Sequence, residues 1–537
     1  MNEGAPVSVR LLPFLRFFLL IIVGKSVIVY ILCKPFCIRR KGCPVEFSNL
    51  FFLYILFPAI TLIYFLLPDM RKKNLALLVI SLVFYAMGQP IYMGLMVALS
   101  YLNYKLALRI DPEDKATVIL PIALNIAVLA VFKYLDFFLN TIGLGLEGGL
   151  LMSGLKAVVK GLNSIGFSFK EPTTVLPIGI SFYTFSVISY LADVYMGKVD
   201  PEEKFQNLLL YFMMFPKMLQ GPIVRYEQIA PQLEERRHHP RAMFEGVQRF
   251  IFGLAKKVLL ADYCGKIIAE LNSGGADNTL VGVWFAAVLF MFQIYYDFSG
   301  YSDMAIGLGK IFGFRYCENF DRPYLSLSVT EFWRRWHMSL SSFFRDYIYI
   351  PLGGNRLGKP RQILNMLAVW ALTGLWHGAS WNFVLWGLYF FVVLVIEKHY
   401  MSTLETLPDW VCRCITLWLL LVGWIIFSHD NFSDLSAAFA AMLGFGGMAT
   451  AGLGTRILNS LPLLAACFIG CSTVPVYVKR IFAGVCDMGR RRRSPNAVTP
   501  PRIVYLAVTA AVMFLLLWLC TVSLVGSTSA PSIYGNF

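Results

Sequence analysis

Long apolar runs recur along the whole length of the chain. They lie at residues 48–68, 74–87, 91–109, 117–135, 174–192, 207–220, 280–296, 363–377, 380–396, 411–428, 457–479 and 503–526. A helix needs about 20 apolar residues to cross a bilayer, and several of the runs are that long. The shorter ones fit half-spans or re-entrant pieces, which exist only where other protein buries them.

These runs predict an all-α polytopic membrane protein with about ten to thirteen helical segments. Strands are not expected, because the runs are long and lack a period-2 alternation. Composition agrees, since 57% of the 537 residues are hydrophobic and only 15% are charged, whereas soluble domains carry about 25% charged residues.

The formal net charge of +15 has a simple origin in the membrane topology. Basic residues cluster between apolar runs, at 39–41, 71–73 and 490–493, and cytoplasmic loops of membrane proteins are enriched in Lys and Arg. We therefore expect a lipid bilayer as the partner and no nucleic acid. The 11 cysteines are scattered, with no CxxC pair, so neither a metal site nor a disulfide framework is expected.

The chain is expected to hold one transmembrane domain at residues 45–537. Residues 1–44 form an N-terminal extension that is either an extra helix, a signal-like segment or a stretch upstream of a natural start at Val45. Residues 482–502 form a basic loop before the last span. The pair His238–His239 lies among charged residues, so a solvated loop is favoured over a ligand site.

Polar and aromatic side chains interleave most densely at residues 293–356. Ser328 followed by Glu331 fits a capping box, which predicts a helix start. A helix beginning there places Trp333, His337 and Ser341 on one face. A neighbouring apolar strip on the same helix consists of Trp336, Leu340 and Phe344. Positive charge comes from Arg334, Arg335 and Arg345. We expect this helix at the membrane interface, ending at the PLGGN sequence.

His377 lies in the middle of an apolar stretch, residues 363–396. These 34 residues are too many for one span and too few for two spans of about 20 residues and a turn. The HGAS sequence supplies a break, with Ser380 as N-cap of a helix starting at Trp381. His377 is thus predicted at the junction of two shortened helices. Ionisable residues within the membrane are functional-site candidates by default, although a structural histidine bonded to a backbone carbonyl is the alternative.

A buried neutral imidazole is a base suited to deprotonating a hydroxyl. The sequence holds no GxSxG motif and no Cys–His arrangement for a covalent intermediate. A histidine acting directly on an alcohol, with a thioester as acyl donor, needs no such intermediate. Burial favours the neutral imidazole, which is the form competent as a base.

From about Val45 onward the sequence resembles the membrane-bound O-acyltransferase family, in its bacterial branch of alginate O-acetyltransferases and teichoic acid D-alanyl transfer proteins. The resemblance is carried by six segments: FYAMGQP (84–90), LPIGISFYTF (176–185), FPKMLQGPI (215–223), YYDFSGYSDMAIGLGKIFGF (295–314), NFDRPYLSLSVTEFWRRWHMSLSSFFRDYIYIPLGG (319–354) and GLWHGASWNF (374–383).

This resemblance implies a ring of tilted transmembrane helices around a central tunnel, with re-entrant or interfacial helices. A cytoplasmic thioester would meet there an acceptor from the other side. The family's invariant histidine falls on His377, which implies a general base. The second active-site position, Asp or Asn in eukaryotic relatives, falls on His337, which implies an orienting residue or an oxyanion stabiliser.

Further site residues are expected around the two histidines. Candidate substrate neighbours are Asn382, Tyr295, Ser341, Trp376 and Trp336. Supporting residues are Asp297, Asp303, Arg334 and Arg335, the two aspartates being expected as helix caps or partners of nearby arginines. No metal and no bound cofactor are expected.

The resemblance implies acetyl transfer from acetyl-CoA, or another acyl thioester, to hydroxyls of an exported, alginate-like cell-surface polysaccharide. It also implies a bacterial inner (cytoplasmic) membrane and an extracytoplasmic acetyltransferase or esterase-like partner protein. The nearest alternatives are D-alanyl transfer to teichoic acid from a carrier-protein thioester and transfer to peptidoglycan. Alternatives of another class are a transporter or flippase, against which no inverted repeat is visible, and a nonenzymatic scaffold.

Overall fold

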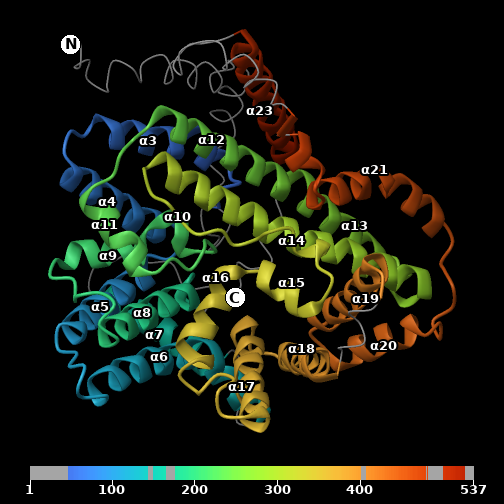
Figure 1. Ribbon diagram of the computed structural model, residues 1–537, viewed down its shortest axis with the longest axis horizontal. Helices are drawn as coiled ribbons and strands as arrows, with labels where there is room; N and C mark the ends of the chain where they lie inside the picture. Colours follow the sequence, from blue (N-terminus) through green and yellow to red (C-terminus); the bar gives the residue numbers. More distant parts are fainter. Residues whose placement is uncertain are drawn as a thin grey trace. The chain divides into compact units, whose positions relative to one another are not determined.

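The computed structural model of the chain describes residues 46–142, 149–164, 176–400, 407–478, 480–481 and 500–526. These residues are helical with connecting loops and turns, and no strand occurs among them (Figure 1). Each of the twelve apolar runs contains helical residues, which confirms the all-α prediction. The extension 1–44 lies outside the described residues, as does most of the predicted loop 482–502, whose last three residues belong to a helix that begins at Pro500.

The chain divides into two compact units. The first comprises residues Met1–Arg249, Ala305–Cys317 and Gly535–Phe537. Its described helices are η2 (Phe52–Leu56), α3 (Phe57–Leu66), α4 (Met70–Gly88), α5 (Pro90–Ala107), α6 (Ala116–Thr141), α7 (Leu150–Ser164), α8 (Ile180–Tyr195), α9 (Phe205–Met213), α10 (Phe215–Met218), α11 (Tyr226–Glu234) and most of α12 (Pro240–Ala255).

One histidine of the first unit departs from its predicted setting. His239 is exposed, but His238 is only half exposed, and its Nε2 lies 2.9 Å from the Tyr64 hydroxyl. The His238 ring also packs edge-on against Phe65, with centroids 5.4 Å apart. The prediction of a solvated loop therefore holds for His239 and was wrong for His238, because the charged loop returns onto α3.

The second unit comprises residues Phe250–Met304 and Glu318–Tyr534. Its described helices are η3 (Lys256–Ala261), α13 (Asp262–Ser273), η4 (Ala276–Asn278), most of α14 (Leu280–Ile311), η5 (Pro323–Leu325), α15 (Val329–Arg335), α16 (Met338–Phe344), η6 (Arg345–Tyr349), α17 (Lys359–His377), α18 (Trp381–Tyr400), α19 (Asp409–Ser428), α20 (Phe432–Met442), α21 (Leu453–Cys471) and α23 (Pro500–Gly526). Every predicted site residue belongs to this unit.

Six described helices are long and apolar enough to cross a membrane. The segments are Ala116–Thr141, Leu280–Ile311, Trp381–His399, Asp409–Ser428, Leu453–Cys471 and Val504–Gly526. The short helices α15 and α16 are not among them. A chain with this set of helices has the length and composition of a multi-pass membrane protein.

Helices α17 and α18 pack against each other at backbone distance. A Cβ atom added to Gly374 would lie 2.4 Å from the Phe383 carbonyl oxygen, and one added to Gly387 would lie 2.5 Å from the Trp370 carbonyl oxygen. Contacts this close leave no room for any side chain. Both positions therefore require glycine, and the resulting contact fixes the end of α17, where His377 lies.

Candidate active site

His377 is the last residue of α17, and only 4% of its surface is exposed. Its ring centroid lies 4.7 Å from that of Trp376, 4.8 Å from that of Trp386 and 5.2 Å from that of Phe427. The imidazole thus lies in an aromatic enclosure built by α17, α18 and α19. An imidazole needs a specific reason to be held there, because removing a polar group from water costs free energy.

The helix break beside His377 has the predicted position but not the predicted form. Gly378 follows in extended backbone and α18 starts at Trp381, as expected. The flanking helices are not shortened, however: α17 has 19 residues and α18 has 20. Both extend beyond the apolar stretch by taking in polar residues, Lys359–Gln362 in α17 and Glu397–Tyr400 in α18. The Ser380 hydroxyl donates to the Asp430 carbonyl, 3.4 Å away.

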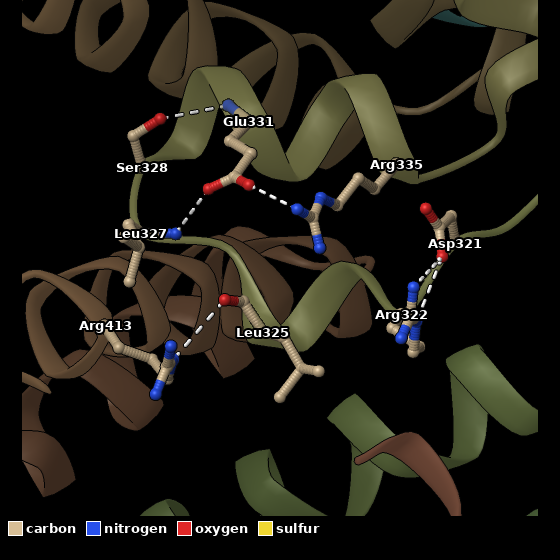
Figure 2. A network of polar contacts seen from close by, with 8 residues as sticks. All are labelled: Asp321, Arg322, Leu325, Leu327, Ser328, Glu331, Arg335 and Arg413. Carbon is tan, nitrogen blue, oxygen red and sulfur yellow. Dashed lines mark hydrogen bonds and ion pairs between the residues drawn. The ribbon is translucent and has the colours of Figure 1, made fainter. Parts of the chain in front are cut away.

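Ser328 caps α15 as predicted, while the Glu331 carboxylate bonds one residue earlier than a regular capping box requires (Figure 2). The backbone N–H of Glu331 donates to Ser328 Oγ at 3.0 Å, and Glu331 Oε2 accepts from the backbone N–H of Leu327 at 2.7 Å. Glu331 also forms an ion pair with Arg335, one helical turn later, at 2.6 Å. These contacts satisfy backbone donors that every helix leaves open at its start, and α15 therefore begins at Val329.

A second acidic residue completes the start of α15. Both Val329 and Thr330 donate their backbone N–H groups to the Glu397 carboxylate, at 2.7 and 2.6 Å. Glu397 belongs to α18, so this cap joins α15 to the helix that follows His377. No local sequence pattern indicates this cap, because Glu397 lies 68 residues from Val329 and 67 residues from Thr330.

The helix that begins at Ser328 does not continue through His337, which contradicts the prediction. It ends at Arg335, and His337 adopts a left-handed backbone with φ 45° and ψ 53° before α16 begins at Met338. Trp333, His337 and Ser341 therefore do not share one helical face. The predicted apolar strip is buried all the same, with Trp336 1%, Leu340 5% and Phe344 5% exposed.

Asn319 holds His337 at this break. Asn319 Oδ1 lies 3.0 Å from His337 Nδ1 and also accepts from the Ser339 hydroxyl at 2.9 Å. Two backbone hydrogen bonds flank the histidine: Met338 N–H donates to the Asn319 carbonyl, and Asp321 N–H donates to the Arg335 carbonyl, both at 3.0 Å. His337 is 3% exposed, and burial lowers the pKa of its imidazole to about 3.

In the structure, the two predicted histidines both pack against the Trp376 side chain. The His337 ring centroid lies 5.8 Å from that of Trp376, and the His377 centroid lies 4.7 Å from it. Phe298 of α14 packs edge-on against His337 at 4.6 Å. Trp376 was predicted as a substrate neighbour, and its indole is the group that both imidazoles contact.

The other predicted substrate neighbours have contacts of their own. Trp336 packs against Trp424, and Tyr295 packs against Trp336, with centroids 5.2 and 6.0 Å apart. The Ser341 hydroxyl donates to the Trp333 carbonyl at 3.2 Å, which is a helix-end contact. Asn382 donates to the carbonyl of Phe427, a ring neighbour of His377, at 3.0 Å.

Three of the four predicted supporting residues form ion pairs, and the two aspartates pair with lysines rather than with the expected arginines. Asp297 pairs with Lys257 at 2.7 Å, and Asp303 pairs with Lys256 at 2.6 Å. Both aspartates lie within α14 rather than at a helix cap. Arg335 pairs with Glu331, and Arg334 is exposed. The π-helical segment η3 places two consecutive lysines toward α14, which the sequence pattern does not reveal.

Several unsatisfied polar atoms surround the histidines. Among the described residues, the buried indole N–H groups of Trp333, Trp386 and Trp424, and His337 Nε2, have no hydrogen-bond partner. Buried polar groups are nearly always hydrogen-bonded, so such a gathering marks a place for a polar ligand. Trp386 and Trp424 escaped the sequence analysis because they look like ordinary apolar residues of spanning helices. No group of three or more His, Cys, Asp or Glu among the described residues is placed to hold a metal ion.

Comparison with known proteins identifies the family. The sequence profile of the membrane-bound O-acyltransferase family matches residues 202–428. A probable alginate O-acetylase of Azotobacter vinelandii is 36% identical over 475 residues, 86% of this chain and 90% of the relative. The chain belongs to the membrane-bound O-acyltransferase family. It is an acyltransferase and a multi-pass membrane protein.

Two further relatives show the breadth of the family. A peptidoglycan O-acetyltransferase of Helicobacter pylori is 30% identical over 442 residues, 75% of this chain and 80% of the relative. A teichoic acid D-alanyltransferase of Bacillus subtilis is 26% identical over 274 residues, 48% of this chain and 69% of the relative. His337, His377 and Asn319 all lie inside the segment that the family profile matches.

Proposed function

We propose that this membrane-bound O-acyltransferase moves an acetyl group from a cytoplasmic thioester, acetyl-CoA or another acyl thioester, to hydroxyls of an exported cell-surface polysaccharide. The observation that carries the proposal is the pair of buried histidines packed on Trp376. Relatives named as O-acetylases or O-acetyltransferases, at 30–36% identity over at least three quarters of the chain, support acetyl as the group and a polysaccharide as the acceptor.

His377 is the proposed general base. Its imidazole takes the proton of the acceptor hydroxyl while that oxygen attacks the thioester carbonyl carbon. The tetrahedral intermediate then collapses, the C–S bond breaks, and the leaving thiolate receives the proton from the imidazolium. The products are an acetyl ester and a free thiol, and no acyl-enzyme is formed.

The aromatic enclosure supports this chemistry in two ways. It keeps water from the reacting centre, so the thioester is not hydrolysed. The indole N–H groups of Trp386, which packs on His377, and of Trp333 and Trp424, which pack on Trp386, are hydrogen-bond donors without protein partners among the described residues. Donors of this kind stabilise an oxyanion as it develops on the carbonyl oxygen.

The proposed setting is the bacterial inner membrane, with the thioester supplied from the cytoplasm and the acceptor reached from the other side. A separate extracytoplasmic acetyltransferase or esterase-like protein is the proposed partner on that side of the membrane. The second candidate function is D-alanyl transfer from a carrier-protein thioester, which the similarity to a teichoic acid D-alanyltransferase favours over a shorter part of the chain.

The test uses the purified protein in proteoliposomes with radiolabelled acetyl-CoA, a D-alanyl carrier-protein thioester, and soluble saccharide acceptors. Label is expected in a base-labile ester on the saccharide with the acetyl donor only. His377→Ala is expected to lose this product by ~10²–10⁴-fold while eluting as a folded protein. His239→Gln, at an exposed histidine, is the matched control and keeps the activity.

Other outcomes contradict the proposal. Product from the D-alanyl thioester alone establishes the second candidate. A transporter or flippase yields no ester from either donor with His377 intact. A scaffold is recognised in cells, where His377→Ala would leave the acetyl content of the surface polysaccharide unchanged.

A further inference from the structure

The amide of Asn319 contacts three different side chains. Its Nδ2 donates to the Ser302 hydroxyl at 3.0 Å, and its Oδ1 contacts Ser339 and His337. Asn319 is itself 1% exposed, and Ser302 is equally buried. A side-chain amide with both ends engaged has one fixed orientation, and that orientation determines what His337 can do.

The hydrogen bonds around Asn319 show that its amide oxygen, rather than its amide nitrogen, faces His337. The backbone N–H of Ser339 lies 3.3 Å from this atom, and a backbone N–H can only donate. The atom must therefore be an acceptor, which excludes the amide nitrogen. The same oxygen lies 3.0 Å from His337 Nδ1, so Nδ1 carries the hydrogen and donates it.

A neutral imidazole has one N–H group, so the other ring nitrogen of His337 holds a lone pair. This Nε2 atom is buried, and no described residue bonds it. The ring is held between Phe298 and Trp376, with centroids 4.6 and 5.8 Å away. Trp376 also contacts His377, so the two imidazoles share one aromatic neighbour.

We propose that Asn319 is a positioning residue that locks His337 in the Nδ1–H tautomer, so that Nε2 accepts a hydrogen bond from a hydroxyl of the acceptor sugar that neighbours the reacting one. This rests on the proposed acyl transfer. His337 then orients the acceptor and does not stabilise the oxyanion, because neutral Nε2 has no hydrogen to donate. His377 remains the base that takes the proton of the reacting hydroxyl.

The backbone around His337 supports a lock rather than a chance contact. A left-handed backbone at a non-glycine residue costs about 1–3 kcal/mol and persists only where the surroundings enforce it. Here the bonds from Met338 N–H to Asn319 and from Asp321 N–H to Arg335 enclose His337 on both sides. The segment that carries the amide therefore also holds the backbone of the histidine that it orients.

The test is ¹⁵N NMR of the full-length protein, labelled at its 6 histidines and purified in detergent. The His337 signals are assigned by their loss in His337→Gln. The wild type is expected to show a protonated Nδ1 and an unprotonated Nε2 between pH 5 and 8. Asn319→Ala is expected to release the tautomer, and Asn319→Asp is expected to keep Nδ1–H while an imidazolium form appears below neutral pH.

Kinetics provide the second readout on the same variants. Asn319→Ala should lower kcat by roughly 10–100-fold, a part of the ~10²–10⁴ supplied by a positioned acid–base group, with KM for the thioester unchanged. In Asn319→Asp the acidic limb of the kcat profile should move up by about one pH unit or more. Asn365→Ala is the control, because that buried amide donates only to the Leu352 and Gly354 carbonyls among described contacts, and it should leave the His337 signals unchanged.

A wild-type spectrum with the proton on Nε2 overturns the proposal, and so does wild-type kcat in Asn319→Ala. The wild-type spectrum decides the tautomer even where the variants do not fold. Failure of the proposed function is distinguishable, because the spectrum then still shows the Nδ1–H tautomer while the protein makes no acetyl ester.

Discussion

His337 and His377, 40 residues apart in the sequence, pack against the same indole, that of Trp376. Each histidine reaches it from a break in a helical segment: His337 from the left-handed residue between α15 and α16, and His377 from the last turn of α17. Helix ends release side chains and backbone groups from helical geometry. Two breaks at one aromatic side chain therefore place two polar rings among aromatic side chains.

The glycine contact between α17 and α18 should be indispensable to this centre. Gly374→Ala forces its new methyl group into the Phe383 carbonyl oxygen, 2.4 Å away, so the helices must separate and His377 must shift. We expect loss of 1–3 kcal/mol or more in unfolding free energy, as for other overpacked sites, and a marked loss of acetyl transfer. Thermal unfolding in detergent and the transfer assay measure both. Gly94→Ala, in α5 with open space around it, should be neutral or stabilising; equal damage by both would contradict the contact.

The buried charge cluster of the second unit should respond strongly to loss of its cation. Lys257 pairs with Asp262 at 2.8 Å and with Asp297 at 2.7 Å, and all three side chains are at most 9% exposed. Lys257→Met leaves two buried carboxylates without their cation, which costs about 3–5 kcal/mol. The unfolding midpoint in detergent should fall accordingly.

Lys256→Met is the matched control for that cluster, since the Lys256–Asp303 pair is 29% and 17% exposed. Its loss should be clearly smaller, because solvent screens a partly exposed pair. The double change Lys257→Met with Asp297→Asn should recover part of the lost stability. Equal losses of stability in Lys257→Met and Lys256→Met would show that the contribution of the cluster to stability does not depend on its burial.

Stability should depend on pH through His337, which lies outside the candidate membrane spans. Burial lowers the pKa of its imidazole to about 3, against about 6.5 in the unfolded chain. Below pH 6.5 the unfolded state therefore binds a proton that the folded state does not, and stability falls as the pH falls from about 6.5 towards about 3. The slope from one such group is at most about 1.4 kcal/mol per pH unit.

His337→Gln should flatten the dependence of the unfolding midpoint between pH 6.5 and 4, whereas His239→Gln should not. An unchanged slope in His337→Gln would mean that His337 is protonated inside the folded protein.

The sequence predicts helix starts and breaks well where neighbouring residues determine them. Ser328 and Glu331 predict the start of α15 because a capping box involves only neighbouring backbone groups, and the HGAS sequence predicts the break before Trp381. His337 was placed inside a continuing helix, because nothing within four residues signals the left-handed backbone. That backbone depends on Asn319, 18 residues earlier.

The site residues likewise fall into those with a local sequence signal and those that depend on contacts between distant segments. The two histidines stand out in the sequence because their neighbours are apolar or aromatic. The resemblance to a family then assigns them roles. The cap from Glu397 to α15, and the enclosure of His377 by Trp386 and Phe427, depend on contacts between distant segments. A tryptophan in a spanning helix has no sequence mark that separates a packing role from one in a site.

A double-mutant cycle on the two histidines tests most directly whether they form one active site. The measurement is the rate of acetyl ester formation by His337→Ala, His377→Ala and the double variant in proteoliposomes, with His239→Gln as control. Residues that act as a unit are strongly non-additive. The double variant should therefore be no slower than His377→Ala within error, whereas a double loss equal to the product of the single losses would show that the histidines act independently.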